Sequence, residues 1–289
     1  MPKHCSPAEG RHGLQSRIPS CVDRQANRAR STLSETAYAV GRIAAASDPC
    51  TEMPTNKPPK RTTAIDPADP RIAKGVFTLR ESALYLGLPN STLHSWAHPG
   101  KGRKPLITSF ASGRREAKVP FIGFAEAYVL SAFRRAGVPM QRIRPAVNVL
   151  ASEIGVEHAL ASERLYTDGA EVLYHYAAQR EDEDLLELTV VRTGQKQFSD
   201  LVKDYLKRIN YGKDGWVTEL QLPTYEHARV IVNPRRGFGL PLVVHGGARV
   251  EDLVDRFVAG DAVADIADDF AVPELEVEDV IRVATRAAA

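Results

Sequence analysis

Two short helical patterns joined by a tight turn constrain the fold more than any other feature of this sequence. The first pattern, residues 78–86, opens on a capping box in which Thr78 caps the helix and Glu81 reaches back to it. A Gly-Leu-Pro turn ends this helix, and a second helix is predicted over residues 90–97. Helices this short are unstable alone, so they must share a core. The sequence therefore predicts a helix-turn-helix, with Leu93 and Trp96 facing inward.

A basic loop and a β-hairpin are predicted to follow. The cations of the loop are Lys101, Arg103 and Lys104. Two β-rich runs, residues 106–110 and 117–122, flank a polar turn that contains Arg114 and Arg115. A hairpin with arginines at its tip, placed after a helix-turn-helix, is predicted to be a wing.

Charge is unevenly distributed along the chain. The 289 residues hold 38 lysines and arginines and 36 aspartates and glutamates, so the formal net charge is only +2. Residues 71–145 carry a net charge of +10, whereas residues 146–222 carry −6 and residues 223–289 carry −5. This division indicates a polyanion as the partner of the basic part and a different partner for the acidic half. A solvated surface that is merely polarised is the alternative.

Composition limits the class of protein. Residues 1–70 are rich in Ser, Thr, Arg and Pro and predict a disordered extension, of which the first 52 residues are expected to be dispensable. No apolar run approaches the roughly 18 residues that span a bilayer, and the N-terminus lacks the apolar region of a secretory signal. A cytoplasmic location without a membrane partner is expected. The 3 cysteines are widely spaced, so neither a metal site nor a cofactor is predicted.

The middle of the chain predicts a mixed α/β region. The expected elements are an apolar helix over 124–135, a helix over 143–154 with Pro145 at a kink or in its first turn, a hairpin over 165–176 centred on Asp168-Gly169, an acidic loop over 181–184, a strand over 186–192, a helix over 198–209, and strands over 216–222 and 228–232.

Three short amphipathic helices are predicted at the C-terminal end. Their apolar stripes are Val250, Leu253, Val254 and Phe257; Val263, Ile266, Ala267 and Phe270; and Val277, Val280, Ile281 and Ala284. Gly260 is expected to end the first helix and Asp261 to cap the second. The predicted fold class is therefore α+β. It comprises a winged helix-turn-helix domain over 71–155, a mixed connecting or oligomerisation region over 156–222, and a C-terminal domain over 223–289 with a strand pair and a three-helix bundle.

The basic module resembles the winged helix-turn-helix of MerR-type regulators. The resemblance rests on an aromatic at Phe77, the turn Leu86-Gly87-Leu88 and the run Ser91-Thr92-Leu93-His94-Ser95-Trp96. Residues 133–144 resemble the linker of that family. His94 stands where the family usually has an arginine, so one contact with DNA is expected to be weaker.

The C-terminal part is similar to the domain of unknown function 433. The matching segments are the run Val230-Ile231-Val232 with Pro234 after it, the sequence Gly239-Leu240-Pro241, and Gly247-Ala248-Arg249, where alanine replaces the threonine of the family. Together the two resemblances imply a VapB-class antitoxin of a type II toxin–antitoxin system. Such a protein represses its own operator and neutralises a PIN-type ribonuclease toxin, here as an expected homodimer or higher oligomer.

Two groups of residues are candidates for these contacts. Short hydrogen-bonding side chains at the start of a recognition helix read the major groove, and nearby cations neutralise phosphates. The candidates for binding double-stranded DNA are Arg80, Asn90, Ser91, Thr92, His94, Ser95, Lys101, Arg103, Lys104, Arg114 and Arg115. A PIN-type nuclease holds metal in clustered carboxylates, and an inserted cation would block them. The candidates for binding the toxin are Arg235, Arg236, Phe238 and Arg249, unless these arginines pair within their own domain.

Catalysis is not predicted. The sequence has no nucleophile elbow, phosphate-binding glycine loop or dinucleotide fingerprint, so the chain is expected not to be an enzyme. A second DNA-reading helix near the C-terminus is disfavoured because carboxylates surround it. The alternative function is that of a MerR-like transcription regulator whose acidic half senses a ligand or only oligomerises.

Overall fold

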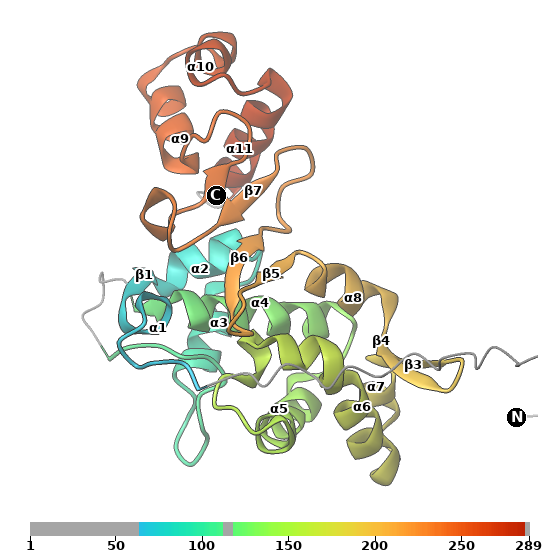
Figure 1. Cartoon of the computed structure of the whole chain (residues 1–289). Helices are drawn as coiled ribbons and strands as arrows, with labels where there is room; N and C mark the ends of the chain where they lie inside the picture. The colour runs from blue at the N-terminus through green and yellow to red at the C-terminus, as the bar shows by residue number, and fades with distance from the viewer. Residues whose placement is uncertain (1–63, 112–117, 287–289) are drawn as a thin grey trace, which may run out of the picture. The chain divides into compact units, whose positions relative to one another are not determined.

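The computed structural model describes residues 64–111 and 118–286, which all belong to one compact unit, Asn56–Ala289. The described part combines helices with three small antiparallel sheets (Figure 1), which confirms the predicted α+β class. A continuous hydrophobic core connects these elements. The predicted extension up to residue 63 and the predicted wing tip, residues 112–117, lie outside the described residues.

The fold includes the last residues of the predicted extension. Asp69 caps α1 (Pro70–Ala73) by accepting the backbone N–H of Arg71 at 2.8 Å. The Arg71 guanidinium also pairs with the carboxylates of Asp69 at 2.7 Å and Asp214 at 2.6 Å. These contacts join the segment to a distant part of the chain, so Asp69 and Arg71 belong to the fold that the structure describes.

The predicted helix-turn-helix is present as α2 (Leu79–Tyr85) and α3 (Asn90–Ala97). Its capping box is formed as expected, because Glu81 accepts the backbone N–H of Thr78 at 2.7 Å and the Thr78 hydroxyl accepts that of Glu81 at 3.2 Å. Gly87 has a φ of 63°, a conformation that glycine adopts without strain. The chain therefore turns between the two helices where the sequence predicted.

The strands of the wing differ from the prediction. The run 106–110 forms no strand; β1 (Gly75–Phe77) pairs instead with β2 (Val119–Pro120). The two predicted limbs of the wing still meet, through the backbone hydrogen bond from Phe110 to Lys118 at 2.8 Å. The segment from the loop to the wing, residues 104–111, therefore has no regular secondary structure, and we call it the strap.

Close packing explains why this strap is irregular. A Cβ atom added to Gly123 would lie 2.0 Å from the carbonyl oxygen of Thr108, so the strap crosses directly over the following helix. The backbone N–H of Thr108 donates to the Glu126 carboxylate at 2.6 Å. Since that N–H is already used, it cannot join a strand ladder.

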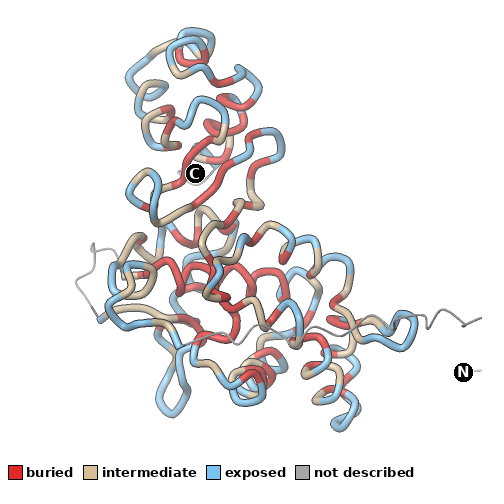
Figure 2. Tube along the Cα trace, viewed as in Figure 1, coloured by how far each residue is buried: buried red, intermediate tan, exposed pale blue. Residues whose placement is uncertain are grey.

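Helix α4 (Phe121–Arg135) is the centre of the core. It begins three residues before the predicted position, because Pro120 takes the extended conformation of an N-cap and the predicted strand 117–122 stops there. All residues from 121 to 133 are buried, and Figure 2 shows buried positions concentrated along this helix. A helix that is apolar all round is expected to be enclosed by other elements.

Helix α5 (Met140–Ile154) confirms the next predicted helix and starts earlier. Pro145 lies inside it rather than in its first turn. Ile143, Leu150 and Ile154 are buried on one face, as their spacing predicted. A short 3-10 turn, η1 (Ala159–Ala161), follows.

Residues 165–176 are helical, so the predicted hairpin is wrong. They belong to α6 (Glu163–Gln179), in which Asp168 pairs at 3.1 Å with the arginine one turn before it. Gly169 faces a neighbouring element so closely that an added Cβ would lie 3.2 Å from the ring of Phe198. The Asp-Gly pair therefore serves helix packing here, and not a turn.

The acidic run 181–184 is only partly a solvated loop. Asp182 is buried and caps α7 (Glu183–Leu186) by accepting the backbone N–H of Leu185 at 3.3 Å. Its carboxylate also lies 3.3 Å from the guanidinium of Arg142. One of the four carboxylates thus has a structural function that the sequence pattern did not reveal.

A small hairpin and a helix follow, where the prediction for 186–209 had a single strand and a helix. The strand is shorter than predicted, β3 (Thr189–Arg192), and pairs with β4 (Gln195–Phe198), which was not predicted. The intervening Thr193 and Gly194 have φ values of 50° and 80°, as a tight two-residue turn requires. The predicted helix is α8 (Asp200–Leu206).

A four-stranded antiparallel sheet joins the predicted middle and C-terminal regions. Its order is β5 (Ile209–Tyr211), β6 (Val217–Gln221), β7 (Val230–Val232) and β8 (Leu242–Val243). Strands β6 and β7 confirm two predicted strands, and β7 with β8 forms the predicted pair. The expected boundary at 222/223 falls inside this sheet, because Leu220 pairs with Val232.

The predicted C-terminal helices are α9 (Val250–Ala259), α10 (Val263–Phe270) and α11 (Glu274–Arg286), and Figure 1 shows them grouped together. Most of their apolar stripe residues contact the core, but Phe257 is 38% exposed. Asp261 does not cap α10. The N-cap is the next residue, without a side-chain bond, and the Asp261 carboxylate pairs with the guanidinium of Arg256 instead.

Candidate nucleic-acid interface

The outer face of α3 presents polar side chains, as the sequence predicted. Asn90, Ser91, His94 and Ser95 are exposed. Leu93 and Trp96 are 0% and 1% exposed and belong to the core. The helix therefore has one buried apolar side and one free hydrogen-bonding side that begins at its N-terminus, where backbone N–H groups favour phosphates.

Thr92 is engaged by an arginine that the sequence reading did not assign to the site. Arg134, near the end of α4, donates from Nη1 to the Thr92 hydroxyl at 2.8 Å. Thr92 also accepts the Ser95 hydroxyl through its backbone carbonyl, at 2.7 Å. Arg134 is exposed, so it adds a cation directly beside the recognition helix. The sequence signal for this cation was the basic pair Arg134-Arg135 at the end of an apolar helix.

The loop after α3 is held in place by a second arginine that the reading missed. Lys101, Arg103 and Lys104 are exposed, as expected. Arg144 of α5 donates to the backbone carbonyl of Lys104 at 2.7 Å. Burial, followed by the positive charge of Arg103, lowers the pKa of Arg144. These cations repel one another, and a bound phosphate would relieve that repulsion.

Two histidines lie together at the end of the recognition helix. The ring centroids of His94 and His98 are 5.1 Å apart, edge to face. Burial, then the charges of His94 and Lys118, lowers the pKa of His98. His98 is thus neutral near pH 7, where it offers a hydrogen-bond donor and an acceptor instead of a charge.

The remaining candidates for DNA contact are Arg80 and the two arginines of the predicted wing tip. Arg80 is exposed on α2. Arg114 and Arg115 lie outside the described residues. The described candidates thus come from two helices and one loop, and the structure adds Arg134 and Arg144 beside them.

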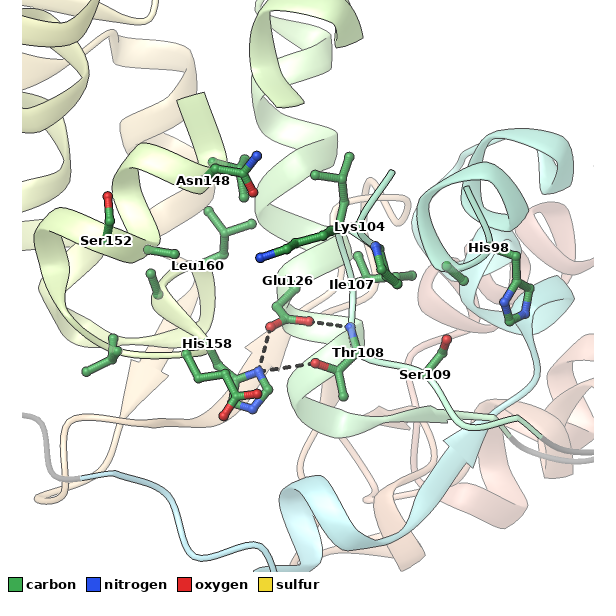
Figure 3. Close-up of a pocket in the computed structure, with 18 of the residues that line it drawn as sticks. His98, Lys104, Ile107, Thr108, Ser109, Glu126, Asn148, Ser152, His158 and Leu160 are labelled. Atoms are coloured by element: carbon green, nitrogen blue, oxygen red, sulfur yellow. Dashed lines mark hydrogen bonds and ion pairs between the residues drawn. The ribbon is translucent and has the colours of Figure 1, made fainter. Parts of the chain in front are cut away.

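A cleft of about 1160 Å³ lies behind the strap and contains an unpredicted polar cluster (Figure 3). Nδ1 of His158 lies 2.9 Å from Glu126 Oε1 and 3.1 Å from the Thr108 hydroxyl. Burial lowers the pKa of His158, but the hydrogen bond and charge of Glu126 outweigh it, so the pKa is raised overall. A lone carboxylate in the apolar run 121–133 was the sequence signal for this cluster.

The cluster fixes the segment that carries the basic loop. Glu126 accepts from the backbone of Thr108 with one oxygen and contacts His158 with the other. In Figure 3 the side chain of Lys104 extends into the same cleft from the strap, and Asn148 faces it from α5. The position of the loop therefore depends on a buried ion pair in the core.

The candidates for toxin contact do not all have the same surroundings. Arg235, Arg236 and Phe238 are exposed, between β7 and β8. Arg249 instead donates from Nε to Asp252 at 2.8 Å, across the first turn of α9. Its guanidinium is therefore paired within its own domain, which is the alternative to toxin contact that the sequence left open.

Within the described residues, no three or more His, Cys, Asp or Glu side chains gather in a way that would hold a metal ion. None of the described helices combines the length and apolar character needed to cross a membrane.

Comparison with known proteins agrees with the helix-turn-helix. Residues 75–147 match a family model described as "Putative DNA-binding HTH domain". This match runs from β1 through α2, α3, the strap and α4 into the first half of α5, which is the region where the exposed polar and basic residues gather.

A curated relative and a solved structure each match about seven-tenths of the chain. The chain is 40% identical over 221 residues to a Mycobacterium tuberculosis protein named "Putative antitoxin VapB45", a match that covers 71% of this chain and 92% of the relative. The crystal structure of Rv2018 from Mycobacterium tuberculosis is 40% identical, with a TM-score of 0.65, and covers 72% of this chain and 97% of that one. The chain therefore belongs to the same family as the protein named "Putative antitoxin VapB45".

Proposed function

We propose that this protein is an antitoxin that represses its own operator and neutralises a PIN-type ribonuclease. The observation that carries the DNA part is the free N-terminal face of α3, where Asn90 and Ser91 are exposed and cations from the loop and from α4 stand alongside. In a helix-turn-helix, this end of the second helix enters the major groove. Arg80, Lys101, Arg103 and Lys104, with Arg114 and Arg115 of the wing, contact phosphates on either side.

The protein acts on DNA as a homodimer or higher oligomer in this proposal. A single helix-turn-helix covers one half-site and buries little surface, whereas a symmetric pair reads two half-sites about one helical turn apart. It is not an enzyme. In this proposal DNA binding belongs to the MerR-like module, and toxin binding belongs to the C-terminal module that is similar to the domain of unknown function 433.

A gel-shift assay tests the DNA part. The purified protein is titrated onto a duplex from the region upstream of its own gene, and onto a scrambled duplex of the same length. We expect retardation of both at low salt, and of the upstream duplex alone as salt rises, because phosphate contacts weaken and base contacts remain. If the upstream duplex shows no retarded band at low salt, operator binding is excluded.

A second candidate function rests on the cleft behind the strap. Its volume of about 1160 Å³ is slightly larger than the roughly 300–1,000 Å³ typical of small-molecule sites, and its walls include the strap that carries the basic loop. A MerR-like regulator would use such a cleft for an effector. The two functions are distinguished by the neighbouring gene, because a small PIN-type protein encoded there favours the antitoxin.

A further inference from the structure

The loop between β7 and β8 presents an unusual combination of exposed side chains. We call residues 233–240 the Arg-Phe loop. Phe238 is 81% exposed, a larger fraction than any other large apolar residue in the described chain. Arg235 and Arg236 beside it are exposed too, and within the described residues neither forms an ion pair. The charge of Arg235 contributes, after the contacts of Arg71, to lowering the pKa of Asp69.

The backbone of the Arg-Phe loop is strained at the aromatic residue. Gly237, Phe238 and Gly239 have φ values of 54°, 59° and 85°, three left-handed positions in a row. Glycine adopts this conformation freely, but a residue with a Cβ atom does so at a cost in free energy. Phe238 therefore occupies a position where stability alone would favour glycine or asparagine.

Contacts on both sides hold the loop in this shape. A Cβ atom added to Gly237 would lie 2.8 Å from Leu242 of β8, and one added to Gly239 would lie 3.1 Å from Val76 of β1. Asn233 accepts the backbone N–H of Arg235 through its side chain at 2.9 Å. The loop is thus tightly packed, and the exposed ring has a fixed backbone beneath it.

An exposed, strained and rigidly held aromatic residue indicates a binding function. Strain of this kind persists where a function uses it, and a pre-organised aromatic beside arginines is the usual composition of a binding hot spot. Two free guanidinium groups favour an acidic partner. Nucleic acid is disfavoured because residues 223–289 carry a net charge of −5, which would repel phosphates.

We propose that the Arg-Phe loop docks into a protein partner, with Phe238 in an apolar pocket and Arg235 and Arg236 paired to carboxylates around it. This inference rests on the proposed function, in which the partner is the PIN-type toxin whose metal-binding carboxylates supply such a cluster. Arg249 is not part of the docking surface, because Asp252 already neutralises it.

The test compares matched variants of the full chain, each co-expressed with the tagged PIN-type protein encoded by the neighbouring gene. The loop variants are Arg235→Glu with Arg236→Glu, and Phe238→Gly. The control is Arg229→Glu with Arg286→Glu, which reverses two other exposed arginines, one of them at the opposite end of β7. Co-purification and the Kd of the isolated pair are measured, together with melting temperature and affinity for upstream DNA.

We expect each loop variant to weaken toxin binding by at least about 30-fold, the loss typical of a hot spot. The control should stay within about 3-fold of the wild type, since rim charges contribute little. Phe238→Gly should also raise the melting temperature, because it removes the backbone strain. Lower toxin affinity in a more stable protein would separate binding from folding.

Other outcomes overturn distinct parts of this account. If the wild type binds the toxin and both loop variants bind equally well, the loop is not the docking element, whereas the proposed function stands. If the loop variants lose DNA affinity and keep toxin affinity, the partner of the loop is nucleic acid and the proposal is wrong. If the wild type itself does not bind the neighbouring protein, the proposed function fails and this inference fails with it.

Discussion

The N-terminal pair α2–α3 and the C-terminal pair α10–α11 are both two helices joined by a tight turn. Their exposed residues nevertheless differ in charge. Gly87 ends the first helix of one pair and Ala271 that of the other, each with positive φ. The exposed start of α3 carries no carboxylate. The second pair instead exposes Asp265, Asp268, Asp269, Glu274 and Glu278. Similar backbone geometry thus sets where side chains point, and their charge selects the partner.

The two regions also use a buried carboxylate in the same way. In the first, Glu126 accepts the backbone N–H of Thr108 at 2.6 Å. In the second, Asp279 accepts those of His227 and Ala228 at 2.6 and 2.9 Å. Each carboxylate fixes a loop to a helix. The functional difference therefore resides in the exposed residues, and the buried ones keep the loops in position.

The largest effect is expected at the start of α3. Asn90→Asp with Ser91→Glu should weaken DNA binding by about 1000-fold, because two base or phosphate contacts of about 2 kcal/mol each are replaced by like-charge repulsion. The same acids at a helix N-terminus favour the helix, so thermal stability should not fall. Fluorescence anisotropy with upstream DNA gives the affinity.

The acidic pair of helices provides the matched control. Asp265→Asn with Asp268→Asn in α10 removes two exposed carboxylates and should leave DNA affinity within about 2-fold of the wild type. If the α10 control lost much DNA affinity and the α3 variant lost little, the DNA-binding surface would lie in the C-terminal region.

Gly123→Ala should have the largest effect on folding. The added Cβ would meet the carbonyl oxygen of Thr108 at 2.0 Å, a backbone atom that cannot move without displacing the strap. We expect a loss of about 3 kcal/mol in the free energy of unfolding, measured by urea denaturation. Gly100→Ala, where an added Cβ has no neighbour within 4 Å, should be neutral. Equal stability of the two variants would mean that the strap does not cross α4 as described.

Glu126→Gln tests the buried pair, with an expected loss of about 2 kcal/mol at pH 6. Because the pKa of His158 is raised above its ordinary value of 6.5, the pair stabilises the fold fully below that pH. This contribution is lost as pH rises through the raised pKa. The difference in stability between the variant and the wild type should therefore shrink as the pH is raised above 6.5. A difference in unfolding free energy that grows with pH would contradict a charged pair between Glu126 and His158.

Asp279→Asn should have a smaller effect, about 1.5 kcal/mol at pH 7. Burial alone would raise the pKa of Asp279, but the N–H groups of Ala228 and His227 and the side chain of Arg282 lower it overall. Its stabilisation is therefore present at neutral pH and is lost as pH falls below 3.8. Glu278→Gln, the exposed neighbour, should be neutral by thermal melting. If Asp279→Asn and Glu278→Gln lower the stability equally, Asp279 does not fix the loop at His227 and Ala228.

Local signals in the sequence predicted the helix-turn-helix well, but they failed for α6. The capping box of Thr78 and Glu81 and the glycine after α2 depend on neighbouring residues, so they could be recognised without the fold. Gly169 could not, since an Asp-Gly pair is a turn signal and only the approach of Phe198 shows why a helix needs glycine there.

The candidate site shows the same division. Exposed polar residues of α3 follow from helical periodicity, because the apolar positions identify the buried face. Arg134 and Arg144 reach the site from α4 and α5, and their contacts with Thr92 and Lys104 join residues 42 and 40 positions apart. Long-range pairs of this kind are set by packing, and a single sequence carries no local pattern for them.

The salt dependence of DNA binding tests the central claim most directly, namely that the basic helix-turn-helix, and not the C-terminal helices, binds DNA. Kd for upstream DNA is measured over a salt series for the wild type and for Lys101→Ala with Arg103→Ala and Lys104→Ala. We expect log K to fall linearly with log salt, and the triple variant to reduce that slope by about 2.7, or 0.9 for each phosphate contact. An unchanged slope in the triple variant, or no binding by the wild type at low salt, would contradict the claim.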